Sequence, residues 1–403
     1  MTMIKGIHST DHIKKNNLQL IWSLILENQP VSRATLSNLS DLSFVSVSNN
    51  VDFLLEQKII QEVGTSETQR GRPPVLLRVN PECGVIVGVS EEFQQNSYIV
   101  TNILGEILEE YFIVHDSDSG STFLEQLQNE IAKISKKYSN FPLGIIGIGL
   151  AHSGDYIARE DRIFSTTPNI SEWVYKTNEE ALQRATLNNY VFTTSLTCAS
   201  VLGEQAILTN ISSSDVLVNV HCGYGLSVGV YLGSYGNIQS PVFTTLFNHT
   251  TINFNGKKCN CGNQGCLVEY ASLRELCKSL NIKKDFSNSL IEEIAGQYRA
   301  GDRNTVIEVS KLVDYLSIGL LNIMYAYQPQ VITLTGPIVH IIDSALLKRI
   351  NSYIEKHSSR SKVIPQIICS PAQNASIASG CCVLVRRNII DIICDSSPKI
   401  VRL

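Results

Sequence analysis

The fold of this chain is decided by the stretch His249-Thr-Thr-Ile-Asn-Phe-Asn-Gly-Lys-Lys-Cys259-Asn-Cys261-Gly-Asn-Gln-Gly-Cys266, which brings three thiols and one imidazole into 18 residues. Gly262 and Gly265 permit tight backbone turns, so that closely spaced sulfurs can converge on one ion. Three thiolates and one imidazole are typical of a closed tetrahedral zinc site that leaves no position for water. We therefore expect a structural Zn²⁺ bound by His249, Cys259, Cys261 and Cys266.

The same stretch resembles the signature of the ROK family, in which a His is followed at the tenth position by Cys-x-Cys-Gly-x-x-Gly-Cys-Leu. This family contains bacterial sugar kinases and sugar-responsive transcriptional repressors. The resemblance implies an α/β protein whose main part is a two-lobed ribonuclease-H-like domain of the actin/hexokinase type. Other residues must decide between the two kinds of protein.

The bulk properties limit the class of protein. A chain of 403 residues exceeds what one hydrophobic core supports, so two or three domains are expected. A net charge of −4 excludes a broadly basic nucleic-acid coat but allows a small DNA-binding module. Residues 1–17 lack a signal-peptide core, and no apolar run reaches the roughly 18 residues that span a bilayer. We expect a cytoplasmic protein without membrane contact, in which the eleven cysteines stay reduced and a disulfide loop at 259–266 is the weaker alternative.

The first 56 residues predict three short helices. Apolar residues follow helical spacing from Lys14 to about Glu27, and Leu36 and Leu39 lie in a second helix that Ser32 can cap. Ser43 can cap a third helix whose inner stripe is Val47, Val51, Leu54 and Leu55. Two short helices joined by a tight turn form a helix-turn-helix, although such a module also serves for packing or dimerisation.

The outer face of the third helix is the predicted DNA-reading surface. Asn pairs with adenine through two hydrogen bonds, and Ser contacts bases or phosphates. The expected contacts are Val45, Ser46, Asn49 and Asn50, while Arg33, Lys14 and Lys15 are candidate phosphate contacts.

A β-hairpin is predicted from residues 59–69 and 75–79, as in the wing of a winged helix. Between its strands lie Arg70, Gly71 and Arg72, which suit a narrow, electronegative minor groove. The Ser-Arg-Ala sequence at 32–34 and the Gly-Arg-Pro-Pro sequence of the wing are similar to the N-terminal domain of ROK repressors.

The domain organisation follows from these patterns. We expect a winged helix-turn-helix domain at 1–80, a first ROK lobe at 81–200 that is completed by about 383–403, and a second lobe at 201–382. The second lobe would carry the zinc loop and the dimerisation surface.

Several positions depart from the pattern of ROK kinases. Ser90 stands at the acidic anchor of the first phosphate loop, and Tyr224 replaces a Thr in the second. Aligned on Leu202-Gly203-Glu204, the kinase Asn-Asp pair corresponds to Ser195-Leu196, and leucine cannot act as the general base. We expect a protein that is not an enzyme and has no catalytic residues.

The resemblance also implies an effector pocket. The family places sugar-contacting residues in the loop after residue 150, in a Pro-Asn motif and beside the zinc loop, although Leu246 and Val268 stand where kinases carry two glutamates. The expected contacts are Ser153, Gly154, Asn169, Ser195, His249 and Glu269.

Three functions remain open. The first is a sequence-specific regulator, a repressor of carbohydrate-related genes, that binds a double-stranded operator as a homodimer or tetramer and responds to a sugar or sugar derivative. The second is a sugar kinase with an added N-terminal domain. The third is a regulator whose signal is a protein partner bound near the zinc loop.

Overall fold

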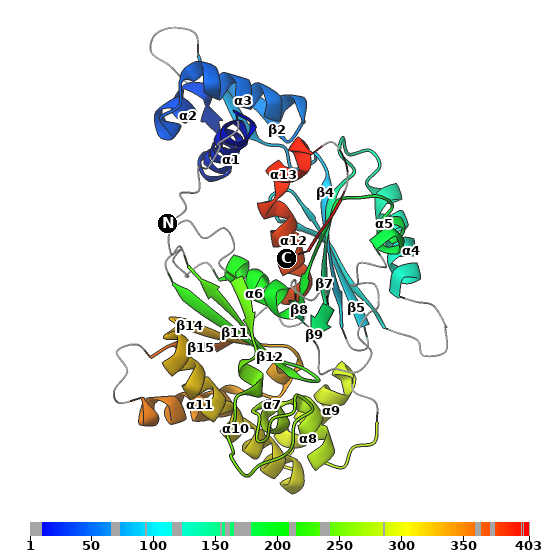
Figure 1. Cartoon of the computed structure of the whole chain (residues 1–403), viewed down its shortest axis with the longest axis vertical. Coiled ribbons are helices and arrows are strands. Elements are labelled where there is room, and N and C mark those ends of the chain that lie inside the picture. The colour runs from blue at the N-terminus through cyan, green and yellow to red at the C-terminus, as the bar shows by residue number, and fades with distance from the viewer. Residues whose placement is uncertain are drawn as a thin grey trace, which may run out of the picture.

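The computed structural model describes residues 10–65, 73–92, 95–114, 123–153, 155–157, 162–164, 179–208, 215–233, 242–284, 287–358, 364–370, 375–395, 397 and 399–402. These residues form a small N-terminal domain and two α/β lobes, each built on its own sheet (Figure 1). No helix in these ranges is both long enough and apolar enough to cross a membrane.

The N-terminal domain is a winged helix-turn-helix. A short strand before the second helix pairs with the hairpin, giving a sheet of order β1-β3-β2. Ser32 Oγ accepts a hydrogen bond from the Thr35 amide, and Ser43 Oγ accepts one from the Ser46 amide, so both predicted caps are confirmed. The elements are α1 (Thr10–Asn28), β1 (Val31–Ser32), α2 (Arg33–Ser40), α3 (Phe44–Glu56), β2 (Ile60–Thr65) and β3 (Val75–Val79).

The core of this domain follows the predicted helical stripes. Ile21 and Trp22 of α1 pack with Leu36 of α2 and with Val47 and Val51 of α3. Leu39 lies in α2 as predicted, and its side chain is 48% exposed. The hairpin is confirmed by the antiparallel pairing of β2 with β3.

Lobe 1 is built on a six-stranded sheet of order β16-β10-β7-β4-β5-β6. Its elements are β4 (Val85–Glu91), β5 (Gln95–Asn102), β6 (Ile107–Val114), α4 (Phe123–Lys137), β7 (Ile145–His152), β8 (Asp155–Ile157), β9 (Arg162–Phe164), α5 (Glu179–Ala185), β10 (Val191–Ser195) and β16 (Ile400–Arg402). Alternate residues of β4 face opposite sides: Val85 and Val87 pack with Ile131 of α4, and Ile86 packs with Ala378.

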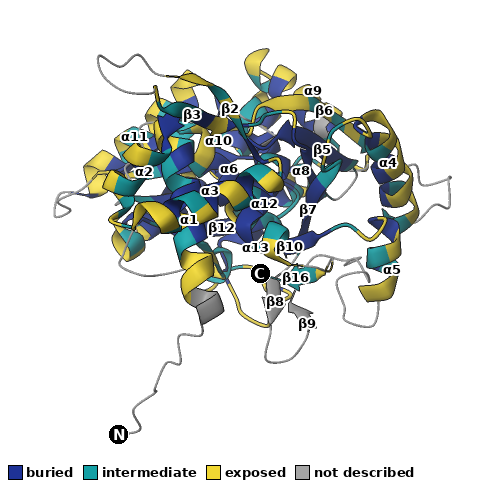
Figure 2. Cartoon of the chain, turned by 90° about the horizontal axis from the view of Figure 1, so that it is seen from above, coloured by how far each residue is buried: buried dark blue, intermediate teal, exposed yellow. Residues whose placement is uncertain are grey.

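Lobe 2 is built on a five-stranded sheet of order β13-β12-β11-β14-β15. Its elements are β11 (Val216–Cys222), β12 (Leu226–Leu232), β13 (Val242–Thr245), η3 (Phe247–His249), α7 (Val268–Ala271), α8 (Leu273–Ser279), α9 (Asn288–Arg299), α10 (Arg303–Tyr327), β14 (Val331–Thr335), η4 (Pro337–His340), α11 (Ser344–His357) and β15 (Gln366–Cys369). Figure 2 shows inner strands such as β5 and β7 as buried and the outward faces of the helices as exposed.

Two helices join the lobes. They are α6 (Leu196–Ile207) and α12 (Ala375–Arg387), followed by the short α13 (Ile389–Cys394). A Cβ added to Gly380 of α12 would lie 1.7 Å from the Ala199 carbonyl oxygen of α6, so the two backbones are in direct contact.

The predicted lobe boundaries need two corrections. The chain returns to lobe 1 at Ala375, not at about residue 383, because small residues of α12 already pack on β4 and β7. The boundary at residue 200 falls inside α6, which is shared: Ala199 packs with Ala151 of lobe 1, and Val201 packs with Leu217 of lobe 2.

Candidate metal centre and DNA-facing surface

The predicted metal ligands lie together. One ligand atom from each of the four residues falls within 4.8 Å of the other three. His249 Nδ1 is 3.5 Å from Cys259 Sγ, and Cys261 Sγ is 3.7 Å from Cys266 Sγ. Tetrahedral bonds of about 2.3 Å to sulfur and about 2.0 Å to nitrogen would give separations of about 3.8 Å between sulfurs and about 3.5 Å between sulfur and nitrogen. The four residues therefore fit a Zn²⁺ ion.

The loop that carries these residues is held by its own backbone. Bridges join Thr251 to Cys266 and Lys258 to Gln264, which bring the two ends of the loop together. Gly265 has φ of +73°, and an added Cβ would lie 1.8 Å from the Asn253 carbonyl oxygen. Only glycine fits this turn, as the sequence indicated.

An ionic network borders the zinc loop. Glu269 Oε1 accepts from Arg274 Nη2 at 2.9 Å, and Arg274 Nε donates to Glu275 Oε1 at 3.2 Å. Lys257 of the loop pairs with the same Glu275 at 3.0 Å. The Glu269 carboxylate, a predicted effector contact, is therefore already paired with a guanidinium.

The other predicted effector residues form a second group. Ser153 directly follows His152, whose strand β7 pairs with Ser195 of β10. Ser195 Oγ accepts from the Cys198 amide at 3.2 Å, so this hydroxyl caps α6. The structure thus brings Ser153 near Ser195, and His249 near Glu269, whereas Gly154 and Asn169 lie outside the described residues.

A buried polar layer, which was not predicted from the sequence, lies between the lobes. Asn219 Nδ2 donates to Thr333 Oγ1 at 2.8 Å, and Ser200 Oγ of α6 donates to Asn219 Oδ1 at 3.0 Å. His221 Nδ1 is 3.2 Å from Thr335 Oγ1, and burial lowers the pKa of His221 to about 4, so its ring is neutral. The signal in the sequence is the presence of Asn and Thr inside otherwise apolar strands.

The same layer contains a buried carboxyl group. Glu204 of α6 is fully buried, and Ser370 Oγ donates to its Oε1 at 2.6 Å. Burial raises the pKa of Glu204 to about 7, because ionisation would place a charge in the interior.

The outer face of α3, which the sequence predicts to read DNA, differs from the prediction at one position. Val45 is 68% exposed and Asn49 is also exposed, whereas Asn50 is only 8% exposed. Asn50 Nδ2 donates to the Ser46 carbonyl at 2.8 Å. Asn50 does not face outward as predicted, because it lies three residues after Val47 on the stripe that packs inward.

Arg33 is held by carboxylates. Its guanidinium pairs with Asp52 at 2.8 Å and with Glu62 at 3.5 Å, which ties α2 to α3 and to the hairpin. The wing residues Arg70, Gly71 and Arg72 lie outside the described residues.

Comparisons with known proteins agree with this architecture. The ROK family model matches residues 94–388. The xylose repressor of Bacillus subtilis (strain 168) is 30% identical over 327 residues, which cover 81% of this chain and 83% of that protein. The DNA-binding transcriptional repressor Mlc of Escherichia coli (strain K12) is 24% identical over 284 residues, or 69% of this chain and 68% of Mlc.

A solved structure shares the whole fold. The crystal structure of a ROK family transcriptional regulator, a homologue of E. coli Mlc, superposes with a TM-score of 0.75 at 21% identity. The superposition covers 95% of this chain and 98% of the chain in the solved structure. The match of the family model over most of the chain shows that this protein belongs to the ROK family.

Proposed function

We propose that this protein is a sequence-specific DNA-binding transcriptional regulator, a repressor of carbohydrate-related genes that acts in the cytoplasm. The single observation that carries the proposal is a capped winged helix-turn-helix with an exposed third helix, joined to a ROK domain. The names of the relatives support it, since the xylose repressor and Mlc are both repressors.

The proposed DNA contacts are Val45, Ser46 and Asn49 of α3, with Arg70 and Arg72 in the minor groove. The exposed stripe of α3 continues into Asp52 and Glu56, whose charges would repel phosphates. The N-terminal half of α3 is therefore the part that suits the major groove. A homodimer or tetramer would place two such helices about one helical turn apart on one face of the operator.

The ROK domain is proposed to be without enzymatic activity. Leu196 is packed against Ala151 and Ala199 where kinases carry the general base. The turn at Gly223 and Tyr224 is docked on the start of α8, since its carbonyls accept from the amides of Leu273 and Arg274. Neither position offers a group that could take up a proton from a sugar hydroxyl at neutral pH.

Zinc would act as a structural element. The ligand set leaves no open coordination position, so the metal would fix the loop that borders the proposed effector pocket. Effector binding there would change the angle between the lobes and so the spacing of the two DNA-reading helices.

The DNA-binding proposal is tested by selecting duplexes from a random library with the purified full-length protein. We expect one enriched motif with two half-sites and a nanomolar-range affinity, of the order of 10⁻⁸ M, that falls steeply with salt. Arg72→Ala should lower the affinity and the salt dependence, whereas Arg349→Ala in lobe 2 should not. Absence of any enriched motif would overturn the proposal.

Kinase activity is tested in the same preparation with ATP, Mg²⁺ and a panel of hexoses. We expect no sugar phosphate, and no recovery in Leu196→Asp, because Ser90 and Tyr224 are also changed. Turnover by the wild-type protein would establish the kinase alternative.

A protein signal is the second candidate. Leu246 is 54% exposed and Phe254 is 84% exposed, so two large apolar side chains lie uncovered at the zinc loop. Thermal-shift measurements with sugars and sugar phosphates separate the two signals. Stabilisation by one sugar supports a small effector, and no response to any of them supports a protein partner.

A further inference from the structure

The DNA-binding domain and lobe 1 are in direct contact through α1 and α13. Lys15 Nζ of α1 lies 2.5 Å from Asp391 Oδ1 of α13. Ile389 and Ile390 of α13 belong to the same apolar cluster as Ile21 of α1. In Figure 1, α13 lies beside the N-terminal domain, at the end of lobe 1 that faces it. The ion pair therefore stands at the edge of a continuous core.

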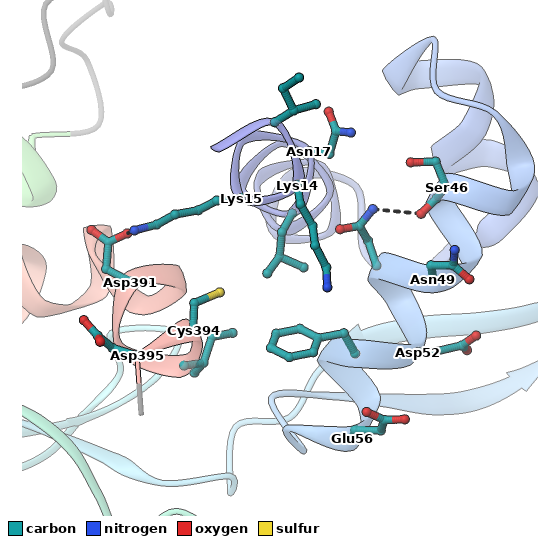
Figure 3. Close-up of a pocket in the computed structure, with 15 residues that line it drawn as sticks. Lys14, Lys15, Asn17, Ser46, Asn49, Asp52, Glu56, Asp391, Cys394 and Asp395 are labelled. Atoms are coloured by element: carbon teal, nitrogen blue, oxygen red, sulfur yellow. Dashed lines mark hydrogen bonds and ion pairs between the residues drawn. The ribbon is translucent and has the colours of Figure 1, made fainter. Parts of the chain in front are cut away.

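A cavity of about 1,020 Å³ opens between α1, α3 and α13. Figure 3 shows Lys15 in contact with Asp391 on one side of the cavity. Ser46, Asn49, Asp52 and Glu56 of α3 line the other side. The exposed stripe of α3, which carries the proposed base contacts, therefore borders the same space as α13.

The charges around this cavity compete with DNA. Asp391 of α13 and Asp395, which directly follows this helix, line it, and Asp395 is fixed to lobe 1 by Tyr190 and Lys399. A carboxylate that pairs with Lys15 takes the place of a phosphate, since both are anions that bind an ammonium group. If α3 entered a major groove, which is about 12 Å wide, the flanking phosphates would lie close to these carboxylates and be repelled by them.

We propose that α13 is an autoinhibitory element: it holds the DNA-binding domain against lobe 1, neutralises Lys15 and blocks access to the exposed stripe of α3. Operator binding then requires the contact between α1 and α13 to open, which couples the position of lobe 1 to DNA affinity. This inference rests on the proposed DNA-binding function and adds a regulatory contact to it.

The first test replaces the anion of the contact. In Asp391→Asn, Lys15 is released and can pair with a phosphate. We expect about two- to fivefold tighter binding to the selected duplex, the size of one exposed ion pair. The log–log dependence of affinity on salt should steepen by about 0.9, as for one added phosphate contact.

The matched control is Asp314→Asn. Asp314 pairs with Arg349 at 2.7 Å in an equally exposed ion pair of lobe 2, away from the cavity. It should leave affinity and salt slope unchanged. If Asp391→Asn also matches the wild type in both, the inference is wrong.

The second test locks the contact between α1 and α13 with a covalent cross-link. Among the eleven cysteines, all within the described ranges, Cys394 of α13 is the exposed one, and it borders the cavity with Lys14. A cleavable thiol cross-linker should join Cys394 to the new thiol of Lys14→Cys. We expect the cross-linked protein to lose operator binding and to regain it on cleavage.

The control Lys14→Cys with Cys394→Ser should show no effect of the cross-linker. Unchanged binding by the cross-linked protein would overturn the inference. Failure of the wild type and of Asp391→Asn to bind any duplex would instead remove the proposed function itself.

Discussion

The N-terminal domain and the ROK domain are stabilised by different kinds of interaction. Within the N-terminal domain, the interactions that form the helices are local: side chains such as Ser32 and Ser43 accept hydrogen bonds from amides three residues away, and the apolar stripes of the helices pack together in a core that continues into lobe 1. The ROK domain depends on partners far apart in the sequence, such as Gly380 against Ala199 and Ser370 against Glu204. Substitutions should therefore act locally in the first and across both lobes in the second.

The largest effect is expected at the zinc loop. Cys266→Ala removes one of four ligands, and structural zinc contributes on the order of 10 kcal/mol in isolated zinc-finger peptides, so the variant should lose its metal and order in the loop. Metal analysis should give about one ion per wild-type chain and none in the variant. The control is Cys277→Ala, which lies outside the ligand cluster and should keep its zinc. A metal-loaded Cys266→Ala protein would disprove the ligand assignment.

The next effect concerns the contact of α6 with α12. Gly380→Ala places a methyl group against the Ala199 backbone, which cannot move as a side chain can, and should destabilise the protein by about 3 kcal/mol. Gly296→Ala is the control, because this glycine of α9 has open space around it and should gain up to about 1 kcal/mol from helix propensity. Urea unfolding measures both, and equal stabilities would show that the helices are not in backbone contact.

A smaller effect depends on pH. The pKa of Glu204 is raised from 4.5 to about 7 by burial, so its contribution to stability is full below pH 4.5 and is lost as the pH rises through 7. Glu204→Gln stays neutral and keeps an acceptor for Ser370. At pH 8 it should be more stable than the wild type by roughly 3 kcal/mol, and the difference should fall nearly to zero at pH 4.5. Denaturation curves across this range measure the difference, with Glu110→Gln on β6 as control.

The smallest effect is expected in the N-terminal domain. Ser43→Ala removes the cap of α3 and should cost about 1 kcal/mol. Ser48→Ala, within the same helix, should be neutral or slightly stabilising, because alanine favours helices. Thermal unfolding compares the two. A larger loss in the Ser48 variant would contradict the local character of this domain.

Much of the fold could be predicted from short-range patterns. Caps, helical stripes and the hairpin depend on residues a few positions apart, so Ser32, Ser43 and the inner face of α3 were placed correctly. The zinc cluster was predictable because its ligands are close in sequence and two glycines mark the turns. Asn50 was misplaced because a polar side chain suggested an outward position, although the helical spacing puts it inside.

Features that depend on distant partners could not be predicted. The hydrogen bond between Glu204 and Ser370 joins residues 166 positions apart, and no local pattern reveals it. The predicted return to lobe 1 lies eight residues after Ala375, because the sequence of α12 does not show that its small residues pack on β4. The contact of Lys15 with Asp391 joins two domains and was equally hidden.

The parallel pairing of β16 with β10 has a consequence for synthesis. The sheet of lobe 1 receives β16, one of its two edge strands, only from residues 400–402, after all of lobe 2 has been made. On the ribosome, the N-terminal domain can fold early, whereas the edge of β10 in lobe 1 stays unpaired until β16 has been synthesised. A nascent chain would thus carry a finished DNA reader before α13, which lies at 389–394, has emerged to restrain it.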